Sequence, residues 1–301
     1  MEFTVGPRTP FSLDYTLDSG QVFRWEHRDE WWYGILNGGV LKVKQEGDSL
    51  RCGSSTDELD GAFVRNYFRL DEDLQPILVS IMKDETITSA VQEFFGMRLI
   101  RQDGWECLAS FVLATNSNIP RIKTMVSNVC AAYGETIEFE GATYHLFPKA
   151  ETLAEASLGK LEECGLGYRA PYLKKVADAV DKGRIDLGEL SLLDYEGARD
   201  LLLRRLSGEK LLLGVGPKVA DCVLLFSCGK DEAFPIDVWI ARSLARFYPH
   251  LLDPRLRKKL GGAKPSLTSR DYERISASAR RHFGRYAGHA QQYLFMMARS
   301  E

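Results

Sequence analysis

The sequence predicts an α+β protein, in which a small, twisted antiparallel β-sheet at the N-terminus is followed by a mainly α-helical body. Three observations lead to this fold class. Residues 21–43 are rich in aromatic and β-branched side chains, apolar residues recur at helical spacing from Asp57 onward, and no repeat or low-complexity tract interrupts the chain. We assign residues 1–97 to a sheet domain with flanking helices and residues 98–301 to the helical body.

The N-terminal strands are expected over residues 21–25, 31–36 and 40–43. Asn37-Gly38 between the last two is a strong signal for a two-residue hairpin turn. Asp71 is expected to cap a helix that ends near Met82, and residues 138–149 and 260–269 are expected to be loops. Further helices are predicted over residues 104–115, 118–133, 171–182, 195–205, 218–228, 237–248, 271–283 and 286–299.

The charge of the chain is unevenly distributed. The net charge of −3 by itself argues against a nucleic-acid-binding protein, but residues 241–301 hold thirteen Lys and Arg against four Asp and Glu. This end therefore carries +9 and the rest of the chain −12. A basic end on an acidic body can attract a polyanion, and it can equally be a solvated face.

The cysteines are scattered, without a Cys-x-x-Cys pair, at Cys52, Cys107, Cys130, Cys164, Cys222 and Cys228. We expect free thiols in a reducing compartment, with no iron–sulfur cluster, no zinc site and no other metal or cofactor. The sequence contains no recognisable secretion signal and no apolar run long enough to cross a membrane. We therefore expect a soluble intracellular protein.

The most informative segment runs from Leu211 to Arg242, with the sequence LLLGVGPKVADCVLLFSCGKDEAFPIDVWIAR. Its first part predicts a helix–hairpin–helix unit over residues 207–228, with Gly214 and Gly216 in the turn. Free amide groups at the start of the second helix would bind a phosphate whatever the base sequence. Tight turns between helices that bind nothing also contain glycine, so the turn alone leaves both explanations open.

Lys218 lies in the first turn of the second helix, where a cation opposes the helix dipole. A helix N-terminus and an apolar wall both favour the neutral amine, which is the nucleophilic form. Contact with a phosphate or with solvent is the alternative role. Cys222 follows four residues later on the same helix face, where it can wall a flat pocket or simply fill the core.

Asp237 lies in a loop, residues 234–240, that leads into the next predicted helix. We expect its side chain to cap that helix, and the amides it accepts from keep a capping carboxylate ionised. An ionised carboxylate close to Lys218 could stabilise positive charge that develops on a substrate. Capping alone is also a sufficient reason for an aspartate at this position.

These residues resemble a known family. The run from Gly214 to Cys222, followed by Pro235-x-Asp237-Val238, is similar to the helix–hairpin–helix, Gly/Pro…Asp (HhH-GPD) signature of base-excision DNA glycosylases. The resemblance extends over nearly the whole chain to the 8-oxoguanine DNA glycosylase/lyase branch. The further motifs, in the same order as in that branch, are Ser19-Gly20-Gln21-x-Phe23-Arg24-Trp25 (its N-terminal strand), Arg98-Leu99-x-Arg101-Gln102-Asp103, Asn116-x-Asn118-Ile119-x-Arg121-Ile122, Gly165-Leu166-Gly167-Tyr168-Arg169-Ala170 and Tyr286-Ala287-Gly288-x-Ala290-Gln291.

The resemblance implies an enzyme that flips 8-oxoguanine out of duplex DNA and excises it. Lys218 matches the amine that attacks C1′ and forms a Schiff base, and Asp237 matches the acid that stabilises the cationic sugar. Gly20 matches the residue whose carbonyl accepts the N7–H of 8-oxoguanine, and Gln291 matches the reader of the Watson–Crick edge. The other matched roles are stacking on the base by Cys222 and Phe295, holding the orphaned cytosine by Asn116, Arg121 and Arg169, and keeping the duplex bent by Tyr168.

Each position also has an ordinary structural explanation. Gly20 could be a strand glycine or bulge, Phe295 could be core, and the arginines could be surface charges, but the joint order of the motifs favours the functional roles. The chain departs from the family at Leu213, where proline is usual, and at Trp239, where eukaryotic relatives carry histidine. The four-cysteine cluster of the endonuclease III and MutY relatives is absent from the sequence.

The expected function is therefore that of a bifunctional DNA glycosylase/AP lyase that acts in base excision repair. The expected partner is double-stranded DNA containing 8-oxoguanine, with cytosine opposite the lesion, bound by a monomer and with no membrane involved. Two alternatives stay open: a monofunctional alkylbase glycosylase that activates water through the aspartate, and a DNA-damage-binding protein without catalysis.

Overall fold

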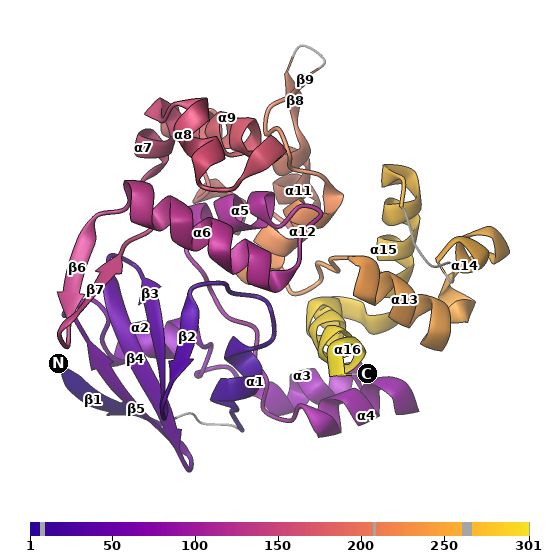
Figure 1. Ribbon diagram of the computed structural model, residues 1–301. Helices are drawn as coiled ribbons and strands as arrows, with labels where there is room; N and C mark the ends of the chain where they lie inside the picture. The colour runs from indigo at the N-terminus through magenta and orange to yellow at the C-terminus, as the bar shows by residue number, and fades with distance from the viewer. Residues whose placement is uncertain (7–9, 207–208, 261–266, 301) are drawn as a thin grey trace.

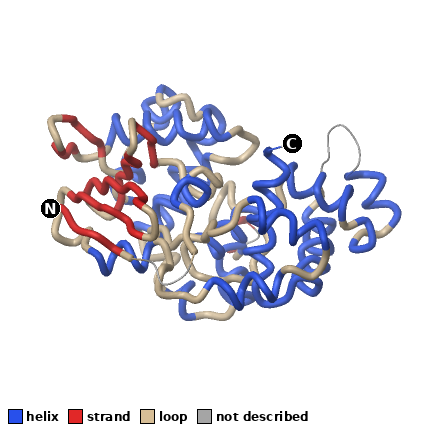
Figure 2. Tube along the Cα trace, turned by 90° about the horizontal axis from the view of Figure 1, so that it is seen from below, coloured by secondary structure: helices blue, strands red, loops and turns tan. Residues whose placement is uncertain are grey.

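A computed structural model describes residues 1–6, 10–206, 209–260 and 267–300 of the chain. A five-stranded antiparallel sheet in the order β1-β5-β4-β3-β2 lies at one side of the molecule, and helices form most of the rest (Figure 1 and Figure 2). The predicted α+β class, with the sheet first and the helical body after it, is confirmed. The sheet strands are β1 (Glu2–Val5), β2 (Trp25–Arg28), β3 (Trp31–Leu36), β4 (Gly39–Glu46) and β5 (Ser49–Ser54).

The β3–β4 hairpin forms where the sequence predicts it. Asn37 and Gly38 both have positive φ angles, 49° and 79°, as the primed turns of two-residue hairpins require. Gly34 in β3 has a different task, because a Cβ built there would lie 2.5 Å from the Trp25 ring. The absent side chain lets the indole lie flat on the strand and close one end of the sheet core.

The helices of the body follow the sheet in chain order. Asp237 caps α13 through its side chain, as predicted, and Asn118, the first residue of a predicted helix, caps α6 in the same way. The helices are α1 (Leu13–Leu17), α2 (Gly61–Tyr67), α3 (Leu74–Ile81), α4 (Glu85–Glu93), α5 (Gly104–Leu113), α6 (Ile119–Tyr133), α7 (Ala150–Glu155), α8 (Leu158–Glu163), α9 (Ala170–Asp181), α10 (Glu189–Leu192), α11 (Tyr195–Leu203), α12 (Pro217–Phe226), α13 (Val238–Phe247), α14 (Pro254–Leu260), α15 (Ser269–Phe283) and α16 (Ala287–Ser300), with 3-10 turns η1 (Gly167–Arg169), η2 (Pro249–Leu251) and η3 (Gly284–Tyr286).

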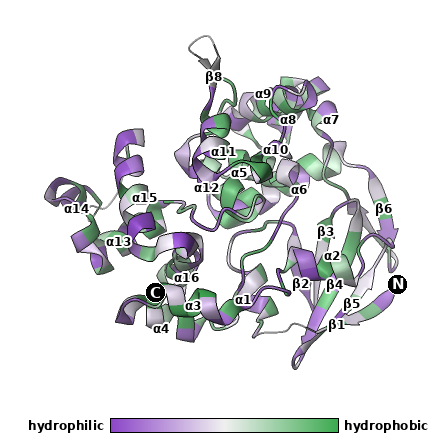
Figure 3. Ribbon diagram, turned by 180° about the vertical axis from the view of Figure 1, so that it is seen from behind, coloured by the Kyte–Doolittle hydropathy of each residue, from purple (hydrophilic) through white to green (hydrophobic). Residues whose placement is uncertain are grey.

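Three apolar cores hold the molecule together. The sheet packs with α1 and α2, a second core gathers α5, α6, α9, α11 and α12, and a third joins α3 and α4 to α13–α16. In Figure 3 the hydrophobic colour is concentrated on α5 and α12 inside the second core. The third core unites residues 74–97 with the C-terminal helices, so it joins two segments that the sequence analysis assigned to different domains.

The predicted strand over residues 21–25 is wrong, because β2 begins only at Trp25. The buried Gln21 side chain makes the hydrogen bonds that a neighbouring strand would otherwise supply. Its Nε2 donates to Thr16 O (3.0 Å) and Arg98 O (2.8 Å), and its Oε1 accepts from the Ile100 amide (3.0 Å). The segment is therefore an ordered loop that a side-chain amide holds in place.

Two other boundaries differ from the predictions. Residues 138–149 are not a plain loop, because β6 (Thr136–Phe139) and β7 (Ala142–His145) form a hairpin whose short, half-exposed strands give no apolar alternation. Asp71 is not the helix cap. Asp73 caps α3, accepting from the Gln75 amide at 3.0 Å.

The helix–hairpin–helix unit begins further upstream than residue 207. Its first helix, α11, ends at Leu203, and a short pairing of β8 (Arg205–Leu206) with β9 (Glu209–Lys210) then precedes the turn into α12. Residues 207–208, and residues 261–266 of the predicted 260–269 loop, lie outside the described residues. None of the helices in the described part of the chain is long and apolar enough to cross a membrane.

Candidate active site

The turn before α12 presents an open helix N-terminus. Gly214 has φ +84°, and a Cβ there would lie 2.7 Å from the Tyr172 ring, so the position requires glycine. Gly216 is the N-cap, Pro217 occupies the first turn, and no side chain caps the helix. The first bond of the helix runs from the Ala220 amide to Gly216 O (3.0 Å). The two amides before it are free to bind an anion.

Lys218 and Asp237 line one cavity of about 660 Å³. The Lys218 Nζ lies 4.9 Å from the centroid of the Phe111 ring, which forms the apolar wall expected beside the amine. Asp237 accepts from the Ile240 amide at 2.8 Å and so begins α13. Burial raises the pKa of the Asp237 carboxyl, while the Ile240 amide and the charge of Lys218 oppose that rise. The amine and the carboxylate therefore act on each other across the cavity.

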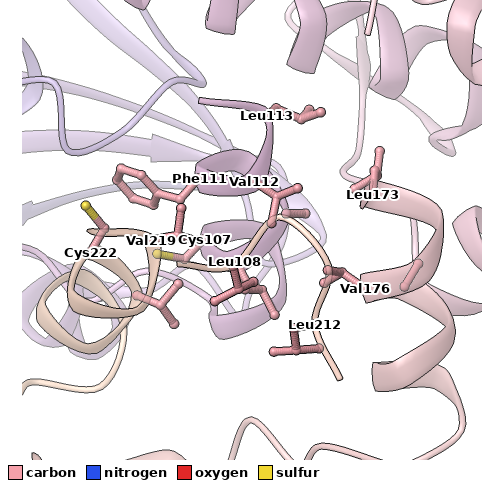
Figure 4. Close-up of a cluster of buried hydrophobic side chains, with 14 of the residues drawn as sticks. Cys107, Leu108, Phe111, Val112, Leu113, Leu173, Val176, Leu212, Val219 and Cys222 are labelled. Atoms are coloured by element: carbon pink, nitrogen blue, oxygen red, sulfur yellow. The ribbon is translucent and has the colours of Figure 1, made fainter. Parts of the chain in front are cut away.

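Cys222 lies behind this wall rather than in the cavity lining. Figure 4 shows it beside Phe111 and close to Cys107 and Val219, in the core that supports α12. Burial raises the pKa of the Cys222 thiol to about 11, and the neighbouring Lys218 opposes the rise. The thiol is thus neutral at physiological pH and contributes a small, polarizable surface beneath the amine.

Gly20 lines the same cavity, and its carbonyl differs from its two neighbours in hydrogen bonding. The carbonyls on either side are occupied: Ser19 O accepts from Gln292 Nε2 (2.7 Å), and Gln21 O accepts from Gln102 Nε2 (2.7 Å). Within the described residues, Gly20 O accepts no hydrogen bond. Gly20 has φ +77°, and a Cβ there would lie 3.1 Å from both Ile119 and Phe295.

Helix α16 contributes two side chains to the cavity lining, Phe295 and Arg299, whereas the expected site residue Gln291 lies on the same helix face but outside the lining. Gln291 is buried, and its Oε1 has no hydrogen-bond partner in the described part of the protein. Phe295, four residues on, is half-buried and lines the cavity. Arg299, which the sequence analysis missed, also lines the cavity and donates from Nη1 to Asp18 O (2.9 Å). The i, i+4 spacing from Phe295 was the signal that could have found it.

The residues expected at the opposite base gather around the loop before α6. Arg169 is 3% exposed and donates from Nε to Thr115 O (2.9 Å) and from Nη2 to Asn116 O (3.0 Å), so its explanation as a surface charge is wrong. Its guanidinium lies 4.4 Å from the centroid of the exposed Tyr168 ring. Asn116 lines the cavity, whereas Arg121 is exposed on the first turn of α6 and does not.

The cavity rim carries a second aromatic surface. Trp239, in the first turn of α13, is 44% exposed beside the equally exposed Val238. The Arg242 guanidinium lies 5.9 Å from the centroid of the Trp239 ring. Among the described residues, no three His, Cys, Asp or Glu side chains are grouped so that they could hold a metal ion.

Comparison with known proteins identifies the family of the chain. Residues 5–108 match the N-terminal domain of 8-oxoguanine DNA glycosylase, and residues 109–260 match the HhH-GPD superfamily of base excision DNA repair proteins. A probable N-glycosylase/DNA lyase of Methanothermobacter thermautotrophicus is 30% identical over 97% of this chain and 95% of its own length.

Two solved structures are similar over nearly the whole chain. MBOgg1 in complex with a low-affinity DNA ligand has a TM-score of 0.86 and 33% identity, covering 99% of this chain and 96% of that one. The Clostridium acetobutylicum 8-oxoguanine glycosylase/lyase, bound to duplex DNA with cytosine opposite 8-oxoguanine, has a TM-score of 0.81 and 32% identity, covering 96% and 92%. The chain therefore belongs to the HhH-GPD superfamily of base excision DNA repair proteins, in its 8-oxoguanine N-glycosylase/DNA lyase branch.

Proposed function

We propose that this protein excises 8-oxoguanine paired with cytosine from duplex DNA, with Lys218 as the nucleophile and Asp237 as the stabilising acid. One observation carries the proposal. An amine at an open helix start and a half-buried carboxylate line the same cavity as Gly20, whose carbonyl accepts no hydrogen bond within the described residues. In this proposal the protein acts as a monomer, inside the cell and on the DNA.

The chemistry begins at C1′ of the flipped nucleotide. The neutral Lys218 Nζ attacks C1′ as the C1′–N9 bond breaks and the departing base keeps the electron pair. The nitrogen bonded to C1′ then gives up one proton, and the base takes up a proton in exchange. Asp237 is ionised and lowers the energy of the positive charge that develops on the sugar. Opening of the sugar ring gives a protonated Schiff base on Lys218. Loss of a C2′ proton then expels the 3′ phosphate and nicks the strand.

Discrimination from guanine rests on Gly20 and Gln291. The N7 atom of 8-oxoguanine carries a hydrogen, whereas N7 of guanine is an acceptor and would face the Gly20 carbonyl lone pair to lone pair. The Oε1 atom of Gln291 has no hydrogen-bond partner among the described residues. This supports a role in which the Gln291 amide bonds to the Watson–Crick edge of the flipped base. Phe295 stacks on one face of the base, and Cys222 approaches the other once the base enters.

Duplex binding uses the amides at the start of α12 and the group around Asn116. Gly214 and Gly216 let the phosphate backbone approach those amides closely. Arg169 and Tyr168 are already tied to the carbonyls of the Asn116 loop, which supports a preformed surface for the orphaned cytosine. Arg121 completes this surface from the first turn of α6.

The proposal is tested by trapping. The protein is incubated with a duplex holding 8-oxoguanine opposite cytosine, borohydride is added, and covalent protein–DNA adducts are separated by electrophoresis. The wild type is expected to release the base and form the adduct. Lys218→Gln is expected to lose the adduct while its affinity for the duplex changes little.

Two other outcomes would reject the proposal. Base release without an adduct, equally fast in Lys218→Gln, would indicate a monofunctional glycosylase that activates water. Tight binding of the damaged duplex with no base release would indicate a damage-binding protein. A matched duplex with guanine at the same position controls for lesion specificity.

A further inference from the structure

Asp221 is the most deeply buried acid next to the cavity, and it lies on α12 three residues after Lys218. It is 0% exposed, and three donors converge on its carboxylate. Oδ1 accepts from the Tyr195 hydroxyl (2.8 Å) and from Arg199 Nε (2.8 Å), and Oδ2 accepts from the Tyr272 hydroxyl (2.7 Å). Both tyrosines and the arginine are buried, and they come from α11 and α15.

Tyr272 does more than satisfy this carboxylate. Its hydroxyl donates to Asp221 and at the same time accepts from the Ile236 amide at 3.2 Å. Ile236 directly precedes Asp237, so a single oxygen joins the lysine helix to the loop that carries the carboxylate. Burial raises the pKa of the Tyr272 hydroxyl well above its ordinary value, so it stays protonated and keeps donating.

The helix that carries this Tyr272 hydroxyl, α15, is also held in place by other contacts. Glu273, the next residue of α15, accepts from Arg199 Nη2 at 2.9 Å, while the same arginine holds Asp221 through Nε. The Tyr272 ring packs in the third core with Phe234, Ile236 and Ile240, which flank Asp237. Two adjacent residues of α15, Tyr272 and Glu273, therefore connect this helix to α11, α12 and the aspartate loop.

We propose that Tyr272 is a positioning residue, whose hydroxyl sets the distance and angle between the Lys218 amine and the Asp237 carboxylate. This inference rests on the proposed roles of those two residues. Asp237 has two tasks, because one oxygen caps α13 while the carboxylate must also face the sugar. Holding the amide of the preceding residue fixes the backbone from which that carboxylate projects.

The chain provides a matched control. Tyr195→Phe and Tyr272→Phe each remove one buried hydroxyl from the same carboxylate, at 2.8 Å and 2.7 Å. In the described residues, no hydrogen bond joins the Tyr195 hydroxyl to residues 234–237. The two variants therefore lose similar bonds to Asp221, and only Tyr272→Phe also releases the aspartate loop. Phenylalanine keeps the ring with which Tyr272, unlike Tyr195, lines the cavity.

The test is single-turnover excision of 8-oxoguanine at saturating enzyme, with duplex affinity and trapping at a preformed abasic site measured in parallel. Tyr272→Phe is expected to slow excision at least ~10-fold, since a displacement of about 1 Å between reacting groups can cost ~100-fold. Its duplex affinity is expected to stay within about 2-fold of the wild type. So is its trapping at an abasic site, which needs Lys218 but no base departure. Tyr195→Phe is expected to excise within about 2-fold of the wild type, with a similar loss of thermal stability.

Equal excision rates in the two variants, or a defect confined to duplex affinity, would overturn the positioning role. Failure of the wild type to excise 8-oxoguanine would refute the proposed function instead, so the two failures are distinguishable. Should Tyr272→Phe not fold, hydrogen exchange of the Ile236 amide in the wild type tests the inference instead. An amide that exchanges as fast as an unbonded one would show that the hydrogen bond from Ile236 to Tyr272 is absent, and would overturn the positioning role.

Discussion

The two walls of the cavity are held in place by different kinds of interaction. Behind Lys218 and Asp237, a buried carboxylate collects an arginine and two tyrosines. Around Gly20, the buried bonds come from neutral glutamines: Gln102 and Gln292 donate to the backbone of the loop, and Gln21 donates from the loop to Arg98 O. The difference matters because charged groups in a low-dielectric interior respond to the loss of one partner far more strongly than neutral amides do.

The largest effect is expected at Asp221. Asp221→Ala leaves the Arg199 guanidinium buried with only Glu273 as a charged partner, which should lower the free energy of unfolding by about 3 to 5 kcal/mol. Urea unfolding followed by circular dichroism measures this loss. A loss no larger than that of a glutamine on the opposite wall would contradict the proposed difference between the walls.

Asp237→Asn is the next largest change, and it acts on rate rather than stability. Asparagine caps helices about as well as aspartate, so the midpoint of unfolding should shift little. Without the negative charge, single-turnover excision should fall by ~10²- to 10³-fold. A variant that excises at the wild-type rate would show that Asp237 only caps α13.

On the neutral wall, Gln21→Leu should cost less. It removes the bonds to Thr16 and Arg98 and leaves the buried Ile100 amide without its partner, for a loss of about 1 to 3 kcal/mol. The same urea titration measures it. Discrimination between 8-oxoguanine and guanine should fall together with stability, because the Gly20 carbonyl is no longer held in one direction.

The smallest effect concerns pH. Burial raises the pKa of Asp237, with the Ile240 amide and Lys218 in opposition, so its carboxylate takes up a proton at a higher pH than an ordinary aspartate. The excision rate should therefore begin to fall, as pH decreases, above the range of a free aspartate. Single-turnover rates across the acidic range measure this limb, and it should be missing from the residual rate of Asp237→Asn.

The predictions from sequence succeeded where local chemistry decides the structure. Asn37-Gly38 turns because both residues tolerate positive φ, and Asp237 caps its helix with a side chain only a few atoms away. The predictions failed where distant partners decide. Residues 21–25 have the composition of a strand, yet the partners of Gln21 include Arg98 and Ile100, far along the chain.

The same limit applies to the site. The motif order identified Lys218, Asp237, Gly20 and Phe295, and all four line one cavity. No local pattern could reveal that Arg169 is buried, because its acceptors on Thr115 and Asn116 come from a loop more than fifty residues earlier. Tyr272 was equally invisible, since a tyrosine on the apolar face of a helix predicts only packing.

The bond from Gln292 to Ser19 spans 273 positions of the chain. The loop that carries Gly20 is therefore translated 273 residues before the side chain that holds it. Contacts so remote in sequence form slowly, because a long loop must close before they gain anything. A nascent chain that has not yet formed α16 therefore lacks the bond that holds the Gly20 loop.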